Sequence, residues 1–133
     1  MGLVDFDAAA LEAMSGGDPD QPVVMLNLLR YRDVAEPGHG VDGLSGREAF
    51  DVYGRRLMKL NARFGVEPIW IGQSHRTVIG DEEWSAVMLV RYPSRRHFVE
   101  MMKDPDYLAI SPIRAAALAD SRLVETTQLV PRP

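Results

Sequence analysis

The stretch EWSAVMLVRYPSRRHFVEMMK, residues 83–103, predicts a strand, the end of that strand and then the start of a helix. Its first half is a short apolar run, which predicts a strand over residues 83–92. Pro93 ends that strand, and Ser94 supplies the side chain of a helix N-cap. The second half spaces its apolar residues as a helix does. We expect the buried face of this helix to carry Phe98, Met101 and Met102.

Similar sequence signals divide the rest of the chain into strands and helices. Apolar or alternating runs predict three further strands, over residues 22–32, 66–79 and 122–130. Helical spacing predicts two further helices, over residues 5–15 and 46–64. Asp104-Pro105 and Ser111-Pro112 both look like an N-cap followed by proline at the first helical position. They predict one helix start after Asp104 and another before the segment 113–121.

The helix over residues 46–64 has clear end signals. Ser45 is a plausible N-cap, and Glu48 lies three positions on, where it completes a capping box. Gly65 occupies the position at which a C-terminal glycine ends a helix. The sequence therefore predicts both ends of this helix.

After the first helix, the predicted order is β-α-β-β-α-β, which is the ferredoxin-like plan. We expect one α+β domain over residues 1–133, with a helical extension over 1–20 and a core over 22–130. The core is expected to be an antiparallel sheet with its helices on one face. VMLNLLRY (24–31) echoes VMLVRY (87–92), and each precedes a helix. We expect these first and third strands to be central, adjacent and parallel.

Both central strands are apolar on both faces, whereas a sheet covered on one side should alternate. Leu26, Leu28, Val87 and Leu89 form the second apolar set. A second copy of the chain is the simplest cover, which predicts a homodimer through the open sheet face. The alternative is that the N-terminal helix covers part of that face.

Composition excludes several classes. The net charge is −4, and a nucleic-acid binder is usually strongly basic. There is no cysteine, so disulfides and thiolate sites are excluded. No stretch is long and apolar enough to span a membrane, and the first residues lack the basic region of a signal peptide. We therefore expect a cytoplasmic location, with no nucleic-acid or membrane partner.

Basic side chains gather where the two central strands are expected to end. If both crossover helices start at the same edge of the sheet, then four of these side chains converge there: Arg30, Arg91, Arg95 and His97. One interpretation is a pocket for a carboxylate, enolate or phenolate. The other is that these side chains are solvated or paired, Arg96 with Glu100 and Arg95 with an acidic loop.

Polar residues within apolar segments supply further candidates. Asn27 interrupts a central strand, so its amide either bonds a neighbour or lines a substrate cavity. Tyr53 lies on the apolar stripe of its helix and is either core or a hydroxyl in the same cavity. If the strand parities hold, Tyr92 and Trp84 share the face of Asn27, together with Tyr31. Trp84 could instead belong to the core or an interface.

No metal site or cofactor is expected. The three histidines, His39, His75 and His97, lack the spacing of metal ligands. There is no phosphate-binding loop, and Ser15 does not follow a strand as a nucleophile elbow requires. A single haem ligand stays open, although nothing selects a histidine for that role.

Four segments resemble the bacterial family of unknown function DUF1330, within the dimeric α/β-barrel superfamily. They are VVMLNLLRYRD, AFDVYGRR, WSAVMLVRYPSRRHFVEMMKDPDY and RAAALADSRL. The resemblance covers roughly residues 22–130, and YPSR-x-x-F…DP-x-Y is its most specific part. FGVEPIW departs from the paired glycine and basic residue that members often have there. The resemblance implies the fold and a dimer but no reaction, since relatives in the superfamily include monooxygenases, isomerases, lactone-forming enzymes and haem proteins.

Two functions remain open from the sequence. The first is a cofactor-independent oxygenase, isomerase or cyclase for a small anionic or carbonyl-containing metabolite. Arg91 or Arg95 would hold the anion, His97 would move a proton, and Asn27 or Tyr53 would bond an enolate oxygen. The second is a non-catalytic dimer that binds a metabolite or a protein. An open polar cavity of about 300 Å³ or more would favour the enzyme.

Overall fold

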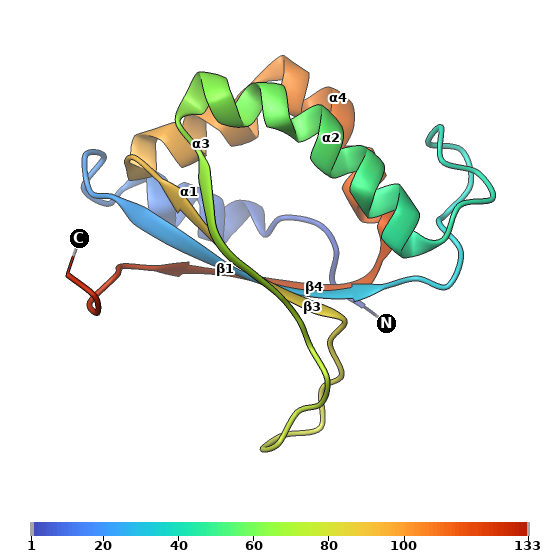
Figure 1. Cartoon of the computed structure of the whole chain (residues 1–133). Coiled ribbons are helices and arrows are strands. Elements are labelled where there is room, and N and C mark those ends of the chain that lie inside the picture. Colours follow the sequence, from blue (N-terminus) through green and yellow to red (C-terminus); the bar gives the residue numbers. More distant parts are fainter. Residues whose placement is uncertain (1, 133) are drawn as a thin grey trace.

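The computed structural model describes residues 2–132. Four strands form one antiparallel sheet in the order β2-β3-β1-β4. They are β1 (Val23–Tyr31), β2 (Glu67–Gln73), β3 (Ala86–Tyr92) and β4 (Leu118–Thr126). The helices are α1 (Ala8–Ser15), α2 (Gly46–Phe64), α3 (Arg95–Lys103) and α4 (Pro105–Ala117). All four helices lie on one side of the sheet (Figure 1). The ferredoxin-like α+β architecture is therefore confirmed.

Local signals set the ends of α2 and α3 as predicted. The Ser45 hydroxyl accepts from the backbone N–H of Glu48, whose carboxylate accepts in return from the N–H of Ser45. Gly65 ends α2 with a left-handed φ of 67°, which favours glycine. The Ser94 hydroxyl accepts from the N–H of His97 and caps α3. These caps act within a few residues, so the sequence reveals them directly.

The second predicted helix start, at Ser111-Pro112, is wrong. Pro112 lies inside the continuous helix α4. Proline has no N–H to donate to the carbonyl of Leu108, four residues earlier. The Ser111 hydroxyl donates to that carbonyl instead, at 3.4 Å. Ser111 therefore compensates for the lost backbone bond and the helix continues.

The last strand begins earlier than the expected 122–130, since β4 starts at Leu118. The loop after β1 satisfies the last carbonyls of α4. The N–H of Arg32 donates to Ala117 O, and that of Glu36 to Ala116 O, both at 2.9 Å. With these carbonyls bonded, the chain passes from helix to strand without a turn.

The expectation of parallel central strands is wrong, because β1 and β3 pair antiparallel. Val24 lies opposite Arg91, and Leu29 lies opposite Ala86. The α2 crossover makes β2 run in the direction of β1, and the hairpin over residues 74–85 then reverses the chain into β3. The crossover helices α2 and α3 consequently start at opposite ends of the sheet.

Alternate residues of β1 face the helices and the open side. Met25 and Leu29 are buried on the helix side, and their neighbours Phe98, Met101 and Met102 of α3 are 1–7% exposed. This confirms the predicted buried face of α3. Helix α1 packs against α3 on the same side, as Figure 1 shows, so it does not cover the open face. No element within residues 2–132 covers that face.

Candidate functional site

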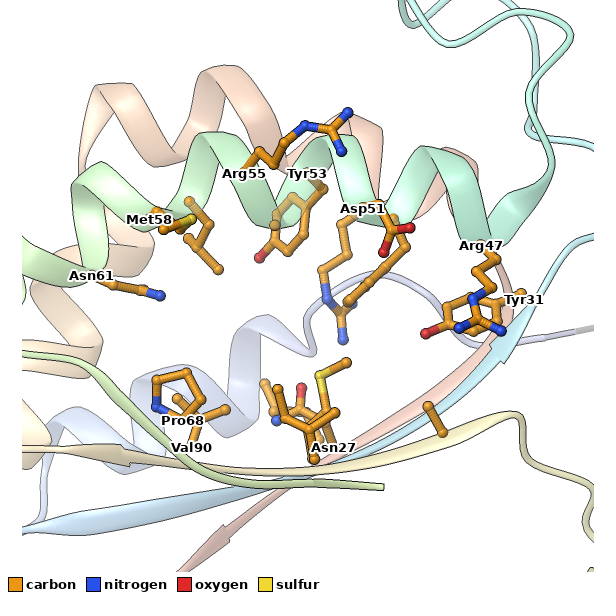
Figure 2. Close-up of a pocket in the computed structure, with 18 of the residues that line it drawn as sticks. Asn27, Tyr31, Arg47, Asp51, Tyr53, Arg55, Met58, Asn61, Pro68 and Val90 are labelled. Atoms are coloured by element: carbon orange, nitrogen blue, oxygen red, sulfur yellow. The ribbon is translucent and has the colours of Figure 1, made fainter. Parts of the chain in front are cut away.

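A cavity of about 620 Å³ lies between α2 and the helix side of the sheet (Figure 2). Apolar side chains from several elements form most of its wall. They include Phe50, Leu57, Met88, Val90, Phe98, Met102 and Leu123. The volume falls within the range of small-molecule sites in proteins. A few polar groups interrupt this wall, and they determine what the cavity can bind.

Asn27 of β1 forms part of the cavity floor, below α2 in Figure 2. It lies opposite Met88 of β3 and Leu123 of β4, which line the cavity too. Within residues 2–132 its side chain makes one hydrogen bond, from Nδ2 to Met25 O at 3.3 Å. The amide thus has bonding capacity left for a ligand.

Two buried tyrosines form a hydroxyl pair in the cavity. The hydroxyl oxygens of Tyr53 (α2) and Tyr107 (α4) are 3.0 Å apart, and both rings are at most 5% exposed. Burial raises the pKa of Tyr53 well above its usual range, and burial raises that of Tyr107 too. Both therefore stay neutral. One of their two O–H protons makes the mutual bond, and the other is left for a third acceptor.

Arg114 of α4 is the buried cation of the site. The residue is 8% exposed and lines the cavity beside Tyr53 and Tyr107. It also lines a second cavity of about 320 Å³ beneath α1. The sequence-based prediction missed Arg114. Its signal was a lone arginine in the apolar run IRAAALA, which is the same kind of signal that selected Asn27.

The two ends of the cavity are polar. At one end, the buried Oδ1 of Asn61 has no hydrogen-bond partner within residues 2–132. At the other end, Tyr31, Arg47 and Asp51 lie at the mouth, as Figure 2 shows. Burial raises the pKa of Tyr31, and the nearby Asp51 carboxylate raises it further. The cavity thus has polar groups at both ends, in addition to Asn27 and Tyr53, which lie between the ends in Figure 2.

The structure brings together three of the predicted site residues, since Asn27, Tyr53 and Tyr92 all line the cavity. Tyr92 is 6% exposed and packs edge-on against Phe98, with ring centroids 4.9 Å apart. Tyr31 joins the same group. Asn27 and Tyr31 of β1 share the helix side of the sheet with Tyr92 of β3 because of strand parity, whereas Tyr53 faces the cavity from α2.

The predicted convergence of four basic residues is wrong. Arg30 lies at the end of β1, whereas Arg91 lies opposite Val24 at the start of β1. Their cationic groups have partners of their own. Arg30 pairs with Asp120 at 3.8 Å, and Arg91 donates to Gln128 Oε1 at 2.7 Å and lies 3.6 Å from Glu67. Neither residue lines the cavity.

The basic turn at the start of α3 is held by hydrogen bonds and ion pairs. Arg95 bonds the Glu125 carboxylate at 2.7 Å, the carbonyl of Asp18 and the side chain of Gln21. Arg96 pairs with Asp20 at 2.9 Å, not with Glu100. These contacts attach α3 to the segment before β1 and to β4.

His97 and Trp84 also lie outside the cavity lining. His97 Nδ1 is 2.6 Å from the Ser94 hydroxyl, within the cap of α3. The Trp84 ring packs under the guanidinium of Arg122, 5.1 Å from the ring centroid.

Within residues 2–132, no three His, Asp or Glu side chains gather in an arrangement that could hold a metal ion. No helix in the same part of the chain has the length and apolar character of a membrane span.

The family model described as "Domain of unknown function (DUF1330)" matches residues 43–127. Protein RPA0582 of Rhodopseudomonas palustris, of unknown function, has a crystal structure with TM-score 0.89. It is 36% identical, and the match covers 98% of this chain and 100% of that chain. No curated protein matches.

Two solved structures share the fold at low identity. One is a dimeric protein of unknown function and ferredoxin-like fold from Bacteroides fragilis, with 13% identity and TM-score 0.54. That match covers 84% of this chain and 100% of that chain. The other is the hydroxynitrile lyase of Passiflora edulis, with 14% identity and TM-score 0.59, where the match covers 86% of this chain and 100% of that chain.

Proposed function

The chain belongs to the DUF1330 family, and we propose that its cavity is the active site of a cofactor-independent enzyme for a small carbonyl-containing metabolite. The observation that carries this proposal is the Tyr53–Tyr107 hydroxyl pair, buried in a cavity of about 620 Å³. The hydroxynitrile lyase shares the fold alone at 14% identity, so its reaction is not carried over.

The spare proton of the tyrosine pair suits a carbonyl oxygen. When a proton leaves the carbon next to the carbonyl, the C–H electron pair forms a C=C bond and negative charge moves to the oxygen. A neutral hydroxyl in an apolar wall stabilises that charge more strongly than water does. Asn27 can bond the same oxygen from the floor of the cavity.

Asp51 is the proposed acceptor of the carbon-bound proton. It is a carboxylate of the cavity mouth, on the cavity side of α2 in Figure 2, whereas Arg55 points away. Return of the proton to another carbon would complete an isomerisation. The proposed reaction class is therefore proton transfer next to a carbonyl group.

The test is solvent exchange. Neutral ketones and 2-oxo acids with aryl or branched bodies are incubated in D₂O, and loss of the proton beside the carbonyl is followed by NMR. We expect wild type to exceed the buffer rate. Tyr53→Phe should lower the enzymatic rate about 10²-fold, as loss of an oxyanion donor does.

Ser45→Ala is the matched control. It loses the cap of α2 and about 1 kcal/mol of stability, comparable to a lost hydrogen bond, without touching the cavity. We expect its exchange rate to equal wild type. Wild-type exchange at the buffer rate for every probe would refute the proposed activity, and an unchanged rate in Tyr53→Phe would refute the role of the pair.

We also propose that a second copy of the chain covers the open sheet face. That face carries Leu26 and Leu28 of β1, Val87 and Leu89 of β3, and Trp70 and Val124, which are 54% and 45% exposed. These apolar side chains form the middle of the face, with Arg30, Arg91 and Arg122 around them, and such an apolar patch with a polar rim indicates an interface. The Bacteroides fragilis protein of the same fold is described as dimeric, which supports a second copy as the cover.

Sedimentation equilibrium tests the dimer. Wild type should give 2 × 14.8 = 29.6 kDa, twice the chain mass. Leu89→Arg places an unpaired charge in the proposed interface, so we expect the mass of one chain. Leu108→Arg makes the same change on the exposed side of α4, where Leu108 is 54% exposed, and should remain dimeric. A wild-type mass of one chain at micromolar concentration would contradict the proposal.

A further inference from the structure

We infer that Arg114 is the carboxylate anchor of the cavity, so that the substrate is a small monocarboxylic acid with an apolar body. The inference rests on the proposed function, since it concerns the same cavity. It adds a substrate class and a residue that the sequence-based prediction did not select.

The ion pairs of the chain single out Arg114. Six arginines have a carboxylate within 4.0 Å: Arg30, Arg63, Arg91, Arg95, Arg96 and Arg122. Each of these is more exposed than Arg114, which is the buried arginine of residues 2–132. Arg114 has no carboxylate within that distance in the same part of the chain. Within residues 2–132, the most buried arginine is thus without a carboxylate close enough to form an ion pair.

The hydrogen bonds of Arg114 are also incomplete. A guanidinium has five N–H donors and is effectively always charged. Within the described residues its side chain makes one hydrogen bond, from Nη1 to Val4 O, at a long 3.4 Å. A buried charge with so few partners is costly, so such groups are normally paired. Its remaining donors are free to bind a carboxylate through two parallel bonds.

The tyrosines around Arg114 do not supply the missing negative charge. Tyr53, Tyr92 and Tyr107 line the same cavity, and the charge of Arg114 lowers their pKa values. Burial outweighs that effect and raises all three pKa values, so the phenols remain neutral at physiological pH. On the side of the smaller cavity, Asp5, Asp7 and Glu125 share a lining with Arg114, but none of these carboxylates lies within 4.0 Å of its guanidinium, and Glu125 pairs with Arg95. A carboxylate that enters the main cavity can therefore supply the close counter-charge.

The surroundings define the rest of the ligand. One guanidinium in a largely apolar wall matches one carboxylate better than a strongly hydrated phosphate dianion. The tyrosine pair lies beside the anchor and has a proton to donate, which favours a carbonyl or hydroxyl oxygen one or two carbons from the carboxylate. Leu57, Met88, Val90 and Met102 suit an aryl or branched chain. The substrate class is thus 2- or 3-oxo and hydroxy monocarboxylic acids.

The far end of the cavity adds a further specificity. Asn61 lies eight residues after Tyr53 on α2, which is about 12 Å along a helix. Figure 2 places Asn61 at the opposite end of the cavity from Tyr31 and Arg47. In Figure 2 the nitrogen of its amide points into the cavity, so a ligand that carries a hydroxyl or carbonyl oxygen at the end of its body would be preferred.

Calorimetry with matched probes tests the anchor. The probes are 3-phenylpropionate, its neutral amide 3-phenylpropionamide, phenylpyruvate and inorganic phosphate. We expect wild type to bind each carboxylate at least tenfold more tightly than the amide, and to bind no phosphate. Arg114→Met should remove the preference of acid over amide. Arg63→Met, which removes an exposed, paired arginine outside the cavity lining, should retain it.

NMR of the arginine Nε–Hε resonances makes the test independent of how the variant folds. In wild type, 3-phenylpropionate should shift the Arg114 resonance, and the amide should not. Equal affinity for acid and amide, a preference that survives in Arg114→Met, or an acid that leaves the Arg114 resonance in place would each refute the anchor. If neutral ketones still exchange protons in a Tyr53-dependent manner, the proposed function stands while the anchor fails. If no probe binds or exchanges, both fail.

Discussion

Phe98→Ala is expected to lower the free energy of unfolding by about 3–5 kcal/mol, the usual cost of removing a buried phenylalanine ring. Phe98 is 2% exposed, and its ring packs edge-on against Tyr92 at an interplanar angle of 89°. Truncation removes this packing and leaves a void that the surrounding helices cannot close fully. Urea unfolding followed by circular dichroism, at one fixed protein concentration, measures the loss.

Phe6→Ala is the matched control for Phe98. Phe6 is 39% exposed and makes a more distant contact with Tyr107, at 6.5 Å between ring centroids. We expect its removal to cost less than about 1.5 kcal/mol, because less apolar area leaves water on folding. Equal losses in the two variants, or a loss below about 1 kcal/mol for Phe98→Ala, would contradict the packing of α3.

Phe98 also connects stability with the site, because it lines both cavities together with Arg114. Its ring is part of the partition between the main cavity and the smaller one beneath α1. Truncation would join the two volumes and admit water to the guanidinium. A charge in water binds an anion less strongly than one in an apolar wall, so weaker binding of carboxylates should accompany the lower stability.

Elements with local signals could be predicted from the sequence. The boundaries of α2 follow from Ser45, Glu48 and Gly65, which act within one turn of the helix ends. The order of elements, and hence the ferredoxin-like fold, follows from apolar periodicity. Pro112 was misread because the compensating hydroxyl of Ser111 depends on the geometry of a helix that already exists. The start of β4 depends on Arg32 and Glu36, more than eighty residues away, and has no local signal.

Part of the cavity lining could also be predicted from local patterns in the sequence. Asn27 and Tyr53 are polar groups in apolar patterns, and strand or helix parity directs them toward the helix–sheet interface. The basic turn of α3 was misleading, because the partners of Arg95 and Arg96 come from residues 18–21 and from Glu125. Charge counts along the sequence do not show which cations will be paired. The separation of Arg30 from Arg91 depends on strand direction, which the sequence echo suggested wrongly.

Gly46→Ala is expected to destabilise the protein by about 3 kcal/mol or more, at the upper end of the cost of overpacking. Gly46 is the buried first residue of α2, and its N–H donates to Arg32 O at 2.9 Å. A Cβ atom there would lie 2.5 Å from Ala117 O and 2.6 Å from Arg32 N. These neighbours are backbone atoms of the loop after β1 and of the end of α4, so no side-chain rotation relieves the clash.

Gly54→Ala separates this clash from the general effect of replacing a helical glycine. Gly54 lies in the middle of α2, and a Cβ there would meet no atom within 4 Å. Alanine is the better helix former by about 1 kcal/mol, so we expect Gly54→Ala to stabilise the protein. We therefore expect Gly46→Ala to lower the free energy of unfolding measured with urea, and Gly54→Ala to raise it.

The contact at Gly46 sets how closely α2 approaches α4. Because α2 carries Tyr53 and α4 carries Arg114, the Gly46→Ala protein that still folds should also lose carboxylate binding. If Gly46→Ala lowers the free energy of unfolding by less than about 1 kcal/mol, then α2 packs less closely at Gly46 against the loop after β1 and the end of α4 than the structure shows.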